Sequence, residues 1–94
     1  MAPTVEALMR SRYSAFTLRD VSYLLDSWHP STRPETLELE PEVQWIRLKV
    51  LASSEDRVEF VATFRVHGKA HKLHENSRFV REGERWYYLD GNAQ

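Results

Sequence analysis

Four polar side chains of this sequence have the types that proton transfer and ligand binding require: Arg12, Glu75, Ser77 and Asp90. Apolar and polar residues alternate along residues 58–90, which predicts strands. The apolar face of these strands also carries Glu75, Ser77 and Asp90. Arg12 falls within the apolar stripe of a predicted helix. A bare carboxylate is costly to bury, so each carboxylate needs a partner or has to stay hydrated.

Two interpretations of this constellation stay open, and they do not exclude one another. In the first, the side chains form the polar floor of a pocket, where Glu75 or Asp90 is an acid, a base or a ligand anchor and Arg12 holds an anionic group. In the second, Arg12 bridges one carboxylate and ties helix to sheet, with a hydrogen bond from Ser77. We favour the second, because buried charges usually survive by pairing.

His29 lies between a tryptophan and a proline, at the expected end of a second helix and near the expected mouth of the pocket. Histidine changes charge near neutral pH and can act as a general base. At a helix C-terminus it also complements the helix dipole, which is the interpretation we favour.

Aromatic residues either line a ligand cavity or fill the core. The candidate ligand-binding residues are Arg12, Tyr13, Trp28, His29, Glu75, Ser77, Tyr88 and Asp90, and the catalytic candidates of an enzyme are Asp90, Glu75 and His29.

Two helices are predicted in the first third of the chain. The first is Val5–Leu18, with Thr4 as its N-cap and apolar residues at helical spacing. The second is capped by Asp20 and ends near His29, because the proline that follows disfavours a helical residue before it. Residues 30–41 contain three prolines and are expected to be mainly connection.

Four strands are predicted after the connection. Residues 45–51 form the first, and three more follow up to residue 90, joined by tight turns at Gly68–Lys69 and at Gly83. With Gly68–Lys69 as a two-residue loop, Phe64 pairs with Leu73. The inward positions of the first strand are Ile46, Leu48 and Val50. The expected inward face of the other three carries Val58, Phe60, Phe64, Leu73, Glu75, Ser77, Phe79, Trp86, Tyr88 and Asp90.

These elements predict an α+β fold, in which two N-terminal helices pack on a curved antiparallel sheet of about four strands and leave a cone-shaped hollow. We expect residues 1–94 to form one domain. The chain has no cysteine and a net charge of −1, so we expect no disulfide, no thiolate zinc site and no binding to nucleic acid or membrane. His71 is expected on one sheet face and His67 and His74 on the other, so we expect no metal site. We expect no cofactor either. Lacking a long apolar run, the protein is expected to be cytoplasmic.

Several blocks of the sequence resemble one family of bacterial proteins. These blocks are RSRYSAF (residues 10–16), WHPSTR (28–33), HENSRF (74–79) and WYYLDG (86–91). Over most of its length the chain is thus similar to the YchJ-like uncharacterised proteins. The resemblance implies a nuclear transport factor 2-like (NTF2-like, or cystatin-like) fold, bacterial origin and no established activity. Many relatives carry a SEC-C-type zinc module, whose cysteines this chain lacks, and the catalytic residues of ketosteroid isomerase, an enzyme with this fold, have no matching positions here.

From these features we expect a non-enzymatic scaffold that binds a small ligand or another protein. The alternative is a small isomerase- or hydrolase-like enzyme that uses a pocket carboxylate or a histidine for proton transfer. The expected ligand is small and either apolar or anionic. The second face of the sheet is less polar than a hydrated face should be, which suggests a homodimer through it. Its apolar residues are Val61, Val80, Tyr87 and Leu89.

Overall fold

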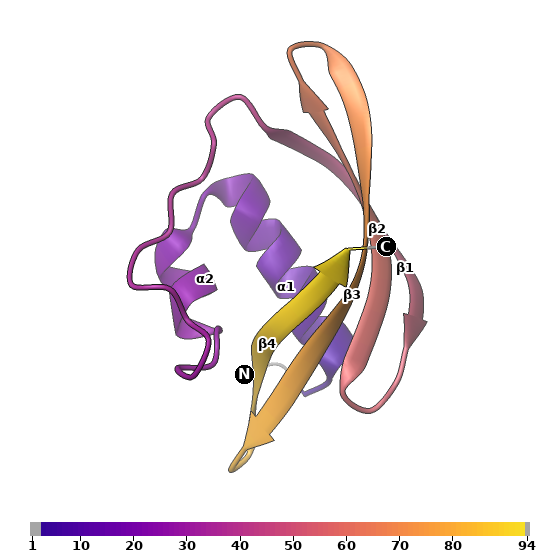
Figure 1. Ribbon diagram of the computed structural model, residues 1–94. Coiled ribbons are helices and arrows are strands. Elements are labelled where there is room, and N and C mark those ends of the chain that lie inside the picture. Colours follow the sequence, from indigo (N-terminus) through magenta and orange to yellow (C-terminus); the bar gives the residue numbers. More distant parts are fainter. Residues whose placement is uncertain (1–2, 94) are drawn as a thin grey trace.

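A computed structural model describes residues 3–93 of the chain (Figure 1). Two helices, α1 (Val5–Leu18) and α2 (Val21–Asp26), precede four strands, β1 (Gln44–Ser53), β2 (Arg57–Val66), β3 (Lys69–Glu82) and β4 (Arg85–Ala93). The strands form an antiparallel sheet in the order β1-β2-β3-β4. Both helices lie on the same side of this twisted sheet, and the connection after α2 runs past the end of α1 to β1 (Figure 1). The predicted α+β fold is confirmed.

Side-chain caps begin both helices where the sequence predicts them. Thr4 and Asp20 each accept a hydrogen bond at 3.1 Å from the backbone amide three residues further on. The second helix ends at Asp26, somewhat earlier than the predicted end near His29. The carbonyl of Ser27 accepts a hydrogen bond from the amide of Tyr88, and the amide of His29 donates to the carbonyl of Tyr88. Pairing with the edge of β4 thus takes the place of a further helical turn.

The β2–β3 hairpin turns one residue earlier than predicted. His67 and Gly68 form the loop, with φ of 50° and 81°, and Lys69 already belongs to β3. Positive φ at both loop positions gives the turn whose twist matches that of the adjoining strands. Phe64 therefore pairs with His71, and not with the predicted partner two residues further on. Because the register shifts by two residues, each side chain keeps its predicted face.

A bulge between β3 and β4 changes which side chains face the helices. Phe79 pairs with Tyr88, whereas Arg78 pairs with Asp90, so β4 contains one extra residue between these pairs. One extra residue reverses the alternation of faces beyond it. The prediction that Asp90 points inward is therefore wrong. Asp90 lies beside Arg78 on the outer face, and Gly91 takes the inward position.

β1 contains a bulge as well, between Trp45 and Arg47. Ile46 is the extra residue, and it is 41% exposed instead of pointing inward as predicted. Trp45 packs against the core in its place. Leu48 and Val50 also pack against the core, as predicted.

The core lies between α1 and the inward face of the sheet. Its buried apolar side chains are Val5, Leu8, Met9, Val58, Phe60, Ala62 and Phe79. The outer face carries polar contacts, including His74 with Glu59 at 2.6 Å and the ion pair of Arg78 with Asp90 at 2.6 Å. A homodimer through this face stays a prediction. Neither helix in residues 3–93 has the length and apolar character of a membrane span.

The β2–β3 loop provides a first test. His67→Asn should raise the free energy of unfolding by roughly 0.5 kcal/mol, because asparagine tolerates positive φ better than histidine does. Urea denaturation measures the change, with Lys69→Asn as the control, since Lys69 lies in a strand. Stabilisation by Lys69→Asn and not by His67→Asn would mean that the loop is Gly68–Lys69.

Candidate functional site

A cavity of about 220 Å³ lies between α1 and the inward face of the sheet. Its walls are mainly aromatic and apolar, with a few polar groups among them. The candidate ligand-binding residues that line it are Arg12, Tyr13, Trp28, Glu75, Ser77 and Tyr88. The two other candidates, His29 and Asp90, do not line it.

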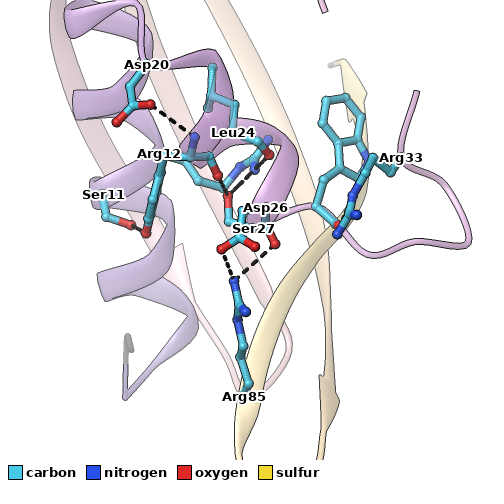
Figure 2. A network of polar contacts seen from close by, with 10 residues as sticks. Ser11, Arg12, Asp20, Leu24, Asp26, Ser27, Arg33 and Arg85 are labelled. Carbon is cyan, nitrogen blue, oxygen red and sulfur yellow. Dashed lines mark hydrogen bonds and ion pairs between the residues drawn. The ribbon is translucent and has the colours of Figure 1, made fainter. Parts of the chain in front are cut away.

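Arg12 reaches from α1 toward the end of α2, as Figure 2 shows. The residue is 3% exposed. Its Nη1 donates hydrogen bonds to the carbonyl of Leu24 at 2.8 Å and to Ser27 Oγ at 2.6 Å. The guanidinium carbon lies 4.4 Å from the ring centre of Tyr88 and 5.3 Å from that of Trp28. Arg12 therefore joins both helices to the aromatic wall of the cavity.

The charge of Arg12 is not neutralised by a carboxylate. Burial lowers the pKa of Arg12 to about 10, while Tyr88, Tyr23 and Glu75 raise it. The guanidinium thus stays charged at neutral pH. The ion pairs formed within residues 3–93 do not include Arg12, so the predicted bridge to a carboxylate is wrong. Neutral oxygen acceptors and aromatic faces stabilise the charge instead.

Glu75, on β3, also lines the cavity. Its Oε2 accepts a hydrogen bond at 2.8 Å from Oγ of the fully buried Ser77. The carboxyl group lies against Gly91, where a Cβ atom would collide with Oε2 and Cδ of Glu75. The bulge that turns Asp90 outward also turns this glycine inward, and so leaves room for the Glu75 side chain.

Two tyrosines contribute hydroxyl groups to the site. Tyr13 Oη is fully buried and has no hydrogen-bond partner in the described part of the chain, and burial raises the pKa of Tyr13. Burial also raises the pKa of Tyr88 to about 12, with Glu75 adding to the rise and Arg12 opposing it. Both phenols are therefore neutral at physiological pH and are not suited to act as bases.

The other two candidates take part in contacts elsewhere. Asp90 accepts hydrogen bonds from Arg78 at 2.7 and 2.6 Å, which hold the pKa of Asp90 below its usual value. His29 contacts Glu82 through Nε2 at 2.6 Å and Ser31 Oγ through Nδ1 at 2.7 Å. A histidine between a carboxylate and a serine can activate that serine, but none of these three residues lines the cavity. Among the catalytic candidates, only Glu75 does.

Sequence reasoning missed much of the apolar wall. The lining residues that it did not assign to the site are Met9, Phe16, Trp45, Phe60 and Leu73. Met9 and Phe16 lie at helical spacing from Arg12, and Phe60 and Leu73 share the predicted inward face with Glu75. These patterns predict burial, but they do not predict whether packing leaves a void.

The histidines near the β2–β3 hairpin do not converge on one point. His67 lies in the loop, His71 stacks on Phe64 with ring centres 5.3 Å apart, and His74 contacts Glu59. Within residues 3–93, no three side chains of histidine, cysteine, aspartate or glutamate are grouped as a metal site would require.

Known proteins match this chain over nearly its whole length. A family model described as the YchJ middle NTF2-like domain matches residues 4–91. A UPF0225 protein of Polaromonas naphthalenivorans is 53% identical over 96 residues, covering 97% of this chain and 71% of the relative. One from Bordetella pertussis is 54% identical over 101 residues, covering 99% and 74%. The solution structure of a SEC-C motif containing protein from Rhodopseudomonas palustris is 35% identical, with a TM-score of 0.85 over 99% of this chain and 80% of that one.

Replacing Arg12 tests its role between the helices. Arg12→Met should lower the free energy of unfolding by about 2 kcal/mol, because it removes charge-assisted hydrogen bonds to Leu24 and Ser27. Urea denaturation at neutral pH measures the loss. Arg10→Met is the matched control, since Arg10 lies on the exposed side of the same helix, paired with Glu6. Equal losses in the two variants would contradict the role given to Arg12.

The fit between Gly91 and Glu75 is testable by a double-mutant cycle. Gly91→Ala should lower the free energy of unfolding by about 1 kcal/mol, because the new methyl group displaces the carboxylate from Ser77. In a Glu75→Ala background the same change should have almost no effect. Thermal or urea denaturation of the four proteins gives the coupling. A loss of the same size in both backgrounds would show that Glu75 does not lie against Gly91.

Proposed function

This chain belongs to the YchJ family of NTF2-like middle domains, and we propose that it is a binding domain for a small molecule held in the cavity. The family and the fold agree with the resemblance found in the sequence. The ligand we propose is about the size of one aromatic ring. Binding, and not catalysis, is the proposed activity.

The observation that carries this proposal is the cavity of about 220 Å³ with its mainly apolar, aromatic wall. A cavity of about 150 Å³ inside a protein is large enough to take up benzene. Ligand sites are typically apolar and contain a few polar groups that fix the orientation of the ligand. Arg12 and Glu75 supply such groups here.

The contacts of the three catalytic candidates favour binding over acid–base catalysis. Glu75 lines the cavity, but Asp90 is bound by Arg78 on the outer face and His29 contacts Glu82 and Ser31. A general acid or base has to lie within hydrogen-bond reach of the substrate, so Asp90 and His29 cannot act on a molecule held in the cavity. A lone carboxylate in an aromatic cavity is better suited to orienting a ligand.

Fluorine NMR of protein labelled with 5-fluorotryptophan tests the proposal. Two of the three tryptophans, Trp28 and Trp45, line the cavity, whereas Trp86 does not. Titration with toluene should shift the Trp28 and Trp45 resonances until they saturate, and should leave Trp86 nearly unchanged. Leu73→Phe narrows the cavity and should weaken binding at least about tenfold. Leu51→Phe is the control, because Leu51 is 44% exposed on β1.

Two results would refute the proposal. One is the absence of a saturable shift at Trp28 and Trp45. The other is an equal shift of the three resonances that Leu73→Phe does not reduce, which would mean that toluene binds elsewhere.

A further inference from the structure

The guanidinium of Arg12 has hydrogen-bond donors left after it has joined α1 to α2. Nη1 bonds to Leu24 and Ser27, whereas Nε and Nη2 have no partner in the described part of the chain. Tyr13 Oη and Asn76 Oδ1 are the fully buried side-chain atoms without a partner there, so Nε and Nη2 are not fully enclosed. Because Arg12 lines the cavity, these two donors are the ones that a ligand held there can use.

Glu75 offers the complementary acceptor. Its Oε2 is bound by Ser77, while Oε1 has no hydrogen bond with the described residues and is not fully enclosed either. Arg12 and Glu75 line the same cavity without forming an ion pair. Each charged group is therefore available to a ligand held in the cavity.

These opposite charges determine which ligands the cavity can hold. An anion would be attracted by Arg12 and repelled by Glu75, whereas a cation would be attracted by Glu75 and repelled by Arg12. A neutral group with an acceptor on one edge and a donor on the other bonds to both residues and leaves no charge unpaired. The aromatic walls favour a flat ring next to that group.

We infer that the cavity selects a neutral, planar, ring-sized molecule with an amide or lactam edge. Its carbonyl oxygen accepts hydrogen bonds from Arg12, and its N–H group donates to Glu75. This inference rests on the proposed function and narrows it to one ligand class. It also disfavours the anionic ligand that the sequence left open.

Three probes that share one ring and differ in charge test the inference. Benzamide is neutral, benzoate is an anion and benzamidinium is a cation, and each is titrated at neutral pH into the 5-fluorotryptophan protein. Benzamide should bind at least about tenfold more tightly than either ion, because each ion meets a like charge in the cavity. Toluene is the reference that lacks the polar edge, and it should bind more weakly than benzamide.

Removing one charge should change the order of affinities. In Glu75→Gln, benzoate should gain at least about tenfold, because the repelling charge is gone, while benzamide changes little since glutamine can still accept its N–H. Glu82→Gln is the matched control, because Glu82 is exposed and contacts His29 outside the cavity. It should leave all the affinities unchanged.

The outcomes separate this inference from the proposed function. Saturable toluene binding together with equal affinities for the three polar probes, or with benzoate the tightest, would overturn the inference and leave the binding proposal standing. Failure of toluene and of every probe to bind would overturn both.

Discussion

The buried guanidinium of Arg12 is the interaction on which the arrangement of the helices depends. It holds the carbonyl and hydroxyl groups at the end of α2 and lies against the rings of Tyr88 and Trp28. A buried charge is stable only when its surroundings replace the water it has lost. Here neutral oxygens and aromatic faces do so, and the donors that remain are available to a ligand in the cavity that Arg12 lines. The same side chain thus fixes the helices and gives the cavity its positive group.

The bulge in β4 determines which carboxylate supplies the negative charge of the cavity. Without the extra residue, Asp90 would point toward α1 beside Glu75, and two carboxylates would face one arginine. With it, Asp90 is bound by Arg78 on the outer face and Gly91 faces inward, where the carboxyl group of Glu75 lies against it. The cavity therefore contains one charge of each sign, and this balance is the basis for preferring a neutral ligand.

The sequence predicts most of the fold because its signals are local. Thr4 and Asp20 mark where the helices begin, and period-two alternation assigns the inward face of β2 and β3. That assignment survives the two-residue error in the hairpin, since such a shift preserves the faces. A bulge, in contrast, reverses the alternation of faces. The wrong inward assignments of Ile46 and Asp90 both result from bulges, which no local sequence pattern marks. The cavity itself depends on how side chains of distant elements pack, so sequence spacing identifies its polar residues but not its volume.

A high-resolution crystal structure of the protein with benzamide would test the central claim most directly. We expect the amide group to lie between the two charged side chains, with its oxygen on the Nε and Nη2 side of Arg12 and its nitrogen at Glu75 Oε1. A direct ion pair between Arg12 and Glu75, with the aromatic walls closed around it and benzamide absent, would contradict the claim that these charges are separate and available to a ligand.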